Sequence, residues 1–176
     1  LKYKGKKVSI QLLTNVRSGN CSQNCAYCAQ SCESQAQIEK YKRVSDEKLY
    51  GDNDLVDNKH LARHCIGLSG ISFTDAEIED LAGRIRKMKK NDTQICCSIG
   101  FLTEKQALML KEAGLNRINH NLNSSRRFYP NICTTHTYDQ RINNIRMLKR
   151  IGFEMQGRCC RYAYGRKGNQ SRVSAN

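Results

Sequence analysis

The sequence has no long apolar segment, and no part of its 176 residues approaches the roughly 20 consecutive apolar residues of a membrane-spanning helix. The first seven residues contain four lysines, but no apolar run follows them as it would in a secretory signal peptide. Aromatic residues make up only 7% of the chain and are not interleaved with basic residues, as they are where proteins stack nucleic-acid bases. We therefore expect a cytoplasmic protein that neither crosses a membrane nor binds nucleic acid.

The net charge of +14 does not change this expectation, because much of it lies at the two ends of the chain. Residues 1–7 carry four lysines, residues 156–176 carry five basic residues, and neither end has an acidic residue. The remaining surplus is modest and spread along the chain. A nucleic-acid interface would instead gather basic residues on one face.

Cysteine is abundant, with ten in the chain. Without a signal peptide, metal binding is a better interpretation than a disulfide framework. Cys21, Cys25 and Cys28 lie close together in a segment that we call the cysteine loop (residues 18–31). Thiolates favour zinc, copper(I) or iron–sulfur clusters, and ordinary sites of these kinds take four ligands. A local set of three suits an iron–sulfur cluster with one free iron. A zinc site completed by Cys32 or a histidine, or chance clustering, is the alternative.

A pattern of short apolar segment and capped helix repeats between residues 64 and 155. Thr74, Thr103 and Thr137 each precede a Glu or Gln by three residues, which predicts capping boxes, and Gly114 and Gly152 are expected helix ends. Apolar residues recur at helical spacing between these signals. We expect about four helices and five strands, the strands at residues 8–13, 64–69, 94–101, 117–122 and 153–155.

This alternation predicts an α/β fold, with parallel strands and right-handed crossover helices. A closed eight-unit barrel takes about 250 residues, so we expect a partial TIM-type barrel over residues 1–155. An open flavodoxin-like sheet is the alternative. Barrel active sites lie at the carboxyl ends of the strands. There we expect the cysteine loop, Cys65, Cys96 and residues 119–123 to converge.

These segments resemble a known family. The cysteine loop, with Tyr27 before its last cysteine, is similar to the signature of the radical S-adenosylmethionine (SAM) superfamily, and Cys-Ala-Tyr-Cys-Ala-Gln-Ser is the form found in biotin synthases. The resemblance covers residues 8–155. It continues, in order and spacing, through residues 95–100, 113–116, 119–125, 128–132 and 134–138, and includes Arg141.

The resemblance implies a transferase that inserts sulfur into dethiobiotin to form biotin. Cys21, Cys25 and Cys28 would hold a 4Fe-4S cluster, whose open iron binds SAM and whose electron releases a 5′-deoxyadenosyl radical. The resemblance also implies a flavodoxin- or ferredoxin-type electron donor and a homodimer. Tyr27 matches a position beside the SAM adenine, and Asn121 and Asn123 match positions that bind substrate and the SAM ribose.

A second cluster, of 2Fe-2S type, donates the sulfur in this family, and Cys65 and Cys96 match two of its ligands. From residue chemistry alone, both would be buried structural cysteines. From residue chemistry alone, Asn121 and Asn123 would be structural residues too, because asparagine makes local hydrogen bonds where loops begin. We expect no ligand role for four further residues, namely Cys97, which should face away from the barrel interior, Cys133, and the structural histidines His120 and His136.

The chain departs from the family after Met155. There the family has a third cysteine ligand of the second cluster, a glycine-rich turn and Met-Gly-Glu, whereas this chain has Gln156 and then a basic segment. One back-translation of residues 164–167, read one base later, gives Met-Gly-Glu. We therefore expect residues 156–176 to be a disordered tail, read out of frame in a longer gene. A partial barrel of this kind should be poorly soluble and should not form biotin.

Two other function classes stay open at this point. One is another radical SAM enzyme, such as a maturase or a cofactor-assembly enzyme. The other is a non-catalytic iron–sulfur or zinc-binding module that contacts RNA through its basic ends.

Overall fold

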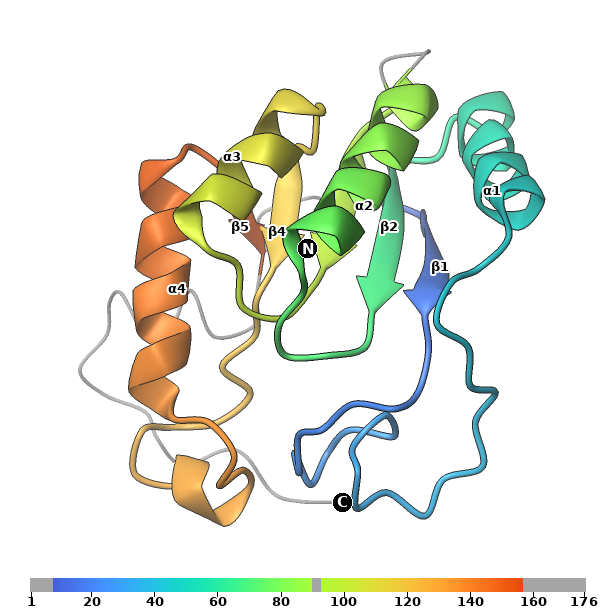
Figure 1. Cartoon of the computed structure of the whole chain (residues 1–176). Coiled ribbons are helices and arrows are strands. Elements are labelled where there is room, and N and C mark those ends of the chain that lie inside the picture. Colours follow the sequence, from blue (N-terminus) through green and yellow to red (C-terminus); the bar gives the residue numbers. More distant parts are fainter. Residues whose placement is uncertain (1–7, 90–92, 157–176) are drawn as a thin grey trace.

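The computed structural model describes residues 8–89 and 93–156. They contain one parallel sheet, whose strands follow one another in sequence order (Figure 1). Its strands are β1 (Gln11–Arg17), β2 (Arg63–Leu68), β3 (Ile95–Ser98), β4 (Arg117–Asn119) and β5 (Glu154–Gln156). Helices α1 (Asp46–Asn58), α2 (Asp75–Met88), α3 (Glu104–Glu112) and α4 (Tyr138–Arg150) cover one face of it. A flavodoxin-like sheet would reverse its strand order, so the sequential order identifies a partial TIM-type fold, as predicted.

The predicted helix signals are confirmed. Thr74, Thr103 and Thr137 each accept a hydrogen bond from the backbone three residues on, and the Glu or Gln there bonds back to the cap. Gly114 and Gly152 follow α3 and α4 with positive φ angles of 97° and 90°, a conformation that glycine adopts without steric cost.

The main core lies between the sheet and the helices. Ile66, Cys97 and Ile118 come from neighbouring strands and are completely buried against apolar residues of α2 and α3, such as Ile78 and Leu110. Alternation along each strand therefore leaves Cys65, Cys96 and Arg117 on the opposite face, which we call the inner face. Cys97 faces away from it, as expected.

Several predicted boundaries are wrong. β1 begins at Gln11 and continues to Arg17, because Thr14 and Val16 still alternate into the core after the apolar segment has ended. β3 and β4 end earlier than predicted, at Ser98 and Asn119. The chain leaves β3 to pass close to the loop after β2, where the Phe101 amide donates to the Ile71 carbonyl over 2.6 Å.

Helix α1 was not located from the sequence. Ser45 caps it, and its buried positions Leu49, Asn53 and Val56 include a polar residue. Asn53 is satisfied inside the core, since its amide donates to the Met88 carbonyl over 3.0 Å and its oxygen lies 3.1 Å from His64 Nδ1. No helix in the described part of the chain has the length and apolarity needed to cross a membrane. The tail predicted from residue 156 lies outside the described residues beyond Gln156.

Candidate functional site

The cysteine loop lies at the carboxyl ends of the strands, together with the segment that joins β4 to α4 (Figure 1). It follows β1 directly, and the loop after β2 supports its beginning. The Ser69 hydroxyl donates to the Gly19 carbonyl over 2.6 Å, and the Ser69 amide donates to the Arg17 carbonyl over 3.1 Å. The sheet edge therefore positions this loop on the inner face.

Asn24 attaches the cysteine loop to residues 129–137, which we call the Thr-His segment. Its side-chain oxygen accepts from the Thr134 and Thr135 amides at 3.0 and 3.3 Å, and its amide donates to the Thr134 hydroxyl over 2.7 Å. The Ala26 amide donates to the Ile132 carbonyl over 2.9 Å. The Thr-His segment is thus the partner that holds the cysteine loop, a role that its sequence did not suggest.

A cavity of about 280 Å³ opens between the cysteine loop and the strand ends. All six residues predicted around the first cluster and SAM line it. They are the three loop cysteines together with Tyr27, Asn121 and Asn123. Gln23, Ser98, Asn119 and Arg141 also line the cavity. Gln23 and Asn119 belong to segments that were expected to converge here, but the sequence assigned none of the four residues a specific role.

The floor of the cavity is a row of small or polar residues in register across the sheet, Asn15, Gly67, Ser98 and Asn119. A Cβ atom at Gly67 would lie 2.9 Å from Asn15 Oδ1, so a side chain at this position would displace the Asn15 amide. Asn119 donates to Ser98 over 3.2 Å, but its own oxygen is buried without a hydrogen-bond partner among the described residues. The three loop thiols that line the cavity are soft donors of the kind that iron–sulfur clusters take, but the Cys25 sulfur lies 3.7 Å from that of Cys133 and forms no compact group with Cys21 and Cys28.

Asn121 and Asn123 are both exposed to the cavity mouth. Asn123 has a positive φ of 60°, a conformation in which asparagine is enriched among non-glycine residues. Asn123 can therefore form the turn and bind a ligand at the same time. Tyr27 is half exposed.

Cys65 and Cys96 lie deeper than the cavity floor, in the next row of the inner face. We predicted them at the strand ends, but Gly67 and Ser98 follow them in β2 and β3. They are direct neighbours across the sheet, because in parallel strands the register sets which side chains lie side by side. A hydrogen bond from Cys96, aided by the nearby positive charges of Arg63 and Arg117, lowers the pKa of Cys65 to about 7.

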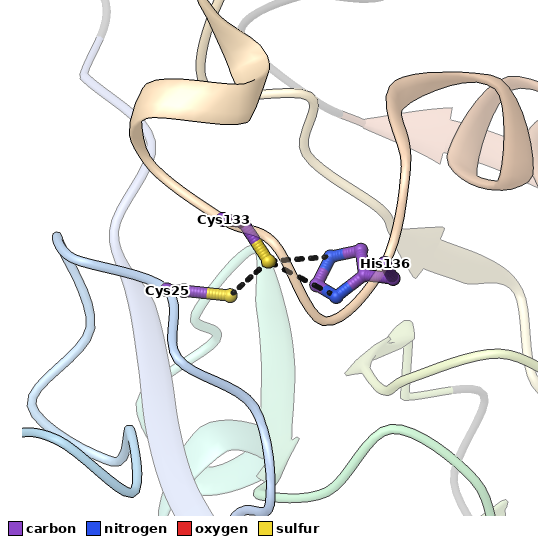
Figure 2. A group of neighbouring side chains, drawn as sticks. All are labelled: Cys25, Cys133 and His136. Atoms are coloured by element: carbon purple, nitrogen blue, oxygen red, sulfur yellow. Dashed lines mark hydrogen bonds between the residues drawn. The ribbon is translucent and has the colours of Figure 1, made fainter.

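The structure also brings together three residues that sequence reasoning kept apart, Cys25, Cys133 and His136 (Figure 2). The sulfurs of Cys25 and Cys133 are 3.7 Å apart, and Cys133 Sγ is 3.3 Å from His136 Nδ1. Burial raises the pKa of the Cys25 thiol to about 11. Burial also opposes ionisation of Cys133, but hydrogen bonds from Thr135 and the His136 amide outweigh it and lower the pKa of that thiol.

His120 and His136 are both buried, and their surroundings favour the neutral imidazole. His120 Nδ1 lies 3.4 Å from the Ile99 carbonyl, and burial lowers its pKa to about 3. Burial and the charge of Arg141 lower the pKa of His136 to about 4. Cys32, in contrast, is exposed and is not among the residues that line the cavity.

Comparison with known proteins gives consistent results. The family model described as the radical SAM superfamily matches residues 15–167. The chain is 43% identical over 152 residues to a biotin synthase of Bacillus cytotoxicus, covering 85% of this chain and 46% of that protein. It is 40% identical over 151 residues to a biotin synthase of Bacillus thuringiensis (strain Al Hakam), with the same coverage. The chain spans about half the length of these curated relatives.

Solved structures agree on the fold. The FeFe-hydrogenase maturase HydG from Carboxydothermus hydrogenoformans superposes with a TM-score of 0.74 at 18% identity, over 89% of this chain and 37% of that one. A methylornithine synthase superposes with a TM-score of 0.73 at 17% identity, over 89% of this chain and 46% of that one. At such identities the likeness extends to the fold alone.

Proposed function

Since the chain belongs to the radical SAM superfamily, we propose that it carries the cluster and SAM site of a biotin synthase. The observation that carries this proposal is the shared cavity. Cys21, Cys25 and Cys28 line it together with Tyr27, Asn121 and Asn123, which are the residues that the family resemblance selects.

In this proposal the three loop thiols hold a 4Fe-4S cluster that, when bound, supplies the electron for reductive cleavage of SAM. Asn121 and Asn123 hydrogen-bond the substrate and the SAM ribose at the cavity mouth, and Tyr27 lies beside the adenine. The Asn24 contacts keep the loop seated on the Thr-His segment. The cavity floor keeps a narrow polar space beneath the thiols, because Gly67 contributes no side chain.

The finer parts of the proposal rest on the resemblance. Cys65 and Cys96 are ligands of a second, 2Fe-2S cluster that gives up sulfur to dethiobiotin. The electron donor is of flavodoxin or ferredoxin type, the protein is cytoplasmic and the assembled enzyme is a homodimer. Arg63 supports the anionic second cluster, because its Nε and Nη1 atoms are buried near Cys65 without a hydrogen-bond partner among the described residues. Gln156 replaces the third cysteine of that site, so we expect the second cluster to be incomplete in this chain.

Anaerobic reconstitution with iron and sulfide tests the first cluster. We expect a 4Fe-4S Mössbauer signature and, after reduction, an electron paramagnetic resonance signal that changes when SAM is added. Cys28→Ala should abolish both signals. The matched control is Cys32→Ala, because Cys32 lies in the same part of the chain but is exposed and outside the cavity lining. A cluster that survives Cys28→Ala, or is lost in Cys32→Ala, would contradict the assignment.

The second cluster needs a separate measurement. Cys65→Ala and Cys96→Ala should each lower bound iron and remove any 2Fe-2S signal, while the SAM-sensitive signal of the first cluster stays. We expect no conversion of dethiobiotin by this chain. Biotin formation by the reconstituted 176-residue protein would show that Gln156 does not disable the site.

A further inference from the structure

Cys25, Cys133 and His136 form a compact donor set at the junction of the cysteine loop and the Thr-His segment (Figure 2). Their ligand atoms lie within 4.8 Å of one another, and all three residues are buried. Of the side chains that the structure describes, no other three His, Cys, Asp or Glu residues meet this condition. Two sulfurs and an imidazole nitrogen form a donor set typical of zinc.

The spacing fits a single tetrahedral ion. Bonds of about 2.3 Å to sulfur and 2.1 Å to nitrogen place two sulfurs about 3.8 Å apart, and a sulfur and a nitrogen about 3.6 Å apart. The observed separations are 3.7 Å between the two sulfurs and 3.3 Å between Cys133 Sγ and His136 Nδ1. These two separations would therefore change by only a few tenths of an ångström on binding, while Cys25 Sγ and the His136 nitrogen, which lie within 4.8 Å, would close to about 3.6 Å.

The surroundings of His136 suit the same role. A ligating imidazole usually donates its other N–H to an oxygen, which fixes the ring. The Tyr129 hydroxyl lies 2.9 Å from His136 Nε2 and accepts that proton when Nδ1 binds the ion. In the metal-free chain Gln23 Oε1 lies 2.8 Å from Nδ1 and accepts its proton, so zinc at Nδ1 would replace this hydrogen bond and leave the Gln23 oxygen as a candidate for the fourth position. In the metal-free chain Arg141 Nε also donates to His136 Nε2 over 3.0 Å, so zinc at Nδ1 would move the imidazole proton to Nε2 and end that hydrogen bond. Arg141 would keep its 2.7 Å hydrogen bond to the Tyr129 hydroxyl, and the two thiolates would offset its charge.

We propose that Cys25, Cys133 and His136 bind one zinc ion when the cysteine loop holds no iron–sulfur cluster. Zinc here joins the cysteine loop to the Thr-His segment. It also uses Cys25, so a chain with zinc bound cannot complete the three-cysteine site. This competition rests on the proposed function, whereas zinc binding itself does not.

Zinc binding is tested on the reduced, metal-free 176-residue chain under anaerobic conditions. Zinc X-ray absorption should give two sulfur and two nitrogen or oxygen neighbours, and cobalt(II) should give a tetrahedral visible spectrum. Cys133→Ser keeps a hydrogen-bonding atom but removes a good ligand, so it should weaken zinc binding by a factor of about ten or more. The matched control is Cys21→Ser, a cysteine of the same loop outside the donor set, and it should bind zinc as the unmodified chain does.

Three or four sulfur neighbours, or loss of zinc in Cys21→Ser with retention in Cys133→Ser, would overturn the proposal in favour of zinc held by the cysteine loop. Circular dichroism of both variants checks that they fold. The absorption result does not depend on any variant.

Competition is measured by adding zinc before iron and sulfide. Zinc should slow cluster formation in the unmodified chain and have little effect in Cys133→Ser. Equal slowing in both would overturn the competition. If neither protein forms a cluster without zinc, the proposed function fails while the zinc-binding result stands.

Discussion

The thiol of Cys65 should ionise at an unusually low pH, and its neighbour Cys96 should be the main reason. Its pKa is lowered from 9.0 to about 7, first by the hydrogen bond from Cys96 and then by the charges of Arg63 and Arg117, against the effect of burial. Cys96 keeps its own proton, and its pKa is raised by that same hydrogen bond and by burial. Gln11 Oε1 lies 3.1 Å from Cys65 Sγ, and a rotation of the amide would turn its N–H groups toward the thiolate.

The expected effect on reactivity follows from two opposing factors. At pH 7 a thiol with a pKa of 7 is half ionised, compared with about 1% for a pKa of 9, so the thiolate is about 50 times more abundant. Each thiolate is less nucleophilic by a factor of about 8, since nucleophilicity falls with basicity. Cys65 should therefore react with iodoacetamide about sixfold faster at pH 7 than it would with an ordinary pKa.

The assay measures alkylation rates by peptide mass spectrometry across pH 5.5 to 9.5, on the metal-free chain. The rate at Cys65 should reach half its maximum near pH 7. Cys96→Ala should move that midpoint upward and slow the reaction at pH 7 about sixfold. Cys97 serves as an internal control, because burial raises its pKa and it should stay unmodified. A midpoint near 9 in the unmodified chain, or one that Cys96→Ala leaves in place, would refute the reasoning.

Three further outcomes follow from single residues. Burial lowers the pKa of His64 to about 4, so unfolding takes up a proton below pH 6.5. The contribution of His64 to the free energy of unfolding should be constant above pH 6.5 and fall by about 3 kcal/mol toward pH 4. Urea titrations should therefore find a smaller loss of stability in acid for His64→Gln than for the unmodified chain. Gly100→Ala should lower the free energy of unfolding by about 2 kcal/mol or more, because its Cβ would lie 2.4 Å from the Ile71 carbonyl oxygen. The control is Gly83→Ala on α2, where a Cβ would meet open space, so this variant should be neutral or stabilising in the same titration. Asn24→Ala should make the cysteine loop more sensitive to limited proteolysis and slow cluster reconstitution, and unchanged cleavage would contradict its anchoring role.

The elements that could be predicted are those with local causes. A capping box needs only a hydroxyl and a Glu or Gln three residues apart, so Thr74, Thr103 and Thr137 predicted three helices correctly. Helix α1 has no such box, and the buried Asn53 interrupts its apolar spacing. That asparagine is satisfied only by Met88 and His64, which come from other elements, so its burial cannot be read from α1 alone.

The candidate site also has a part that the local sequence predicts and a part that depends on packing between distant segments. The spacing of Cys21, Cys25 and Cys28 is a local pattern, and the family resemblance supplied the residues from the other strands. Cys133 and His136 could not be paired with Cys25 from sequence, because more than a hundred residues separate them and only the packing of the Thr-His segment on the cysteine loop brings them together. A cysteine and a histidine three residues apart were the one available signal.

The two groups of thiols lie at different depths on one inner face, and the row between them decides whether they can act on one molecule. Cys65 and Cys96 occupy one row, and Asn15, Gly67, Ser98 and Asn119 occupy the next row toward the cysteine loop. Bulky apolar residues there would separate the two levels, but Gly67 has no side chain and the buried Asn119 oxygen has no hydrogen-bond partner among the described residues. Under the proposed function, a substrate that meets the radical from the cysteine-loop cluster and the sulfur of a second cluster at Cys65 and Cys96 would lie at this row. Gly67→Val should then impair substrate binding while leaving both sets of thiols in place.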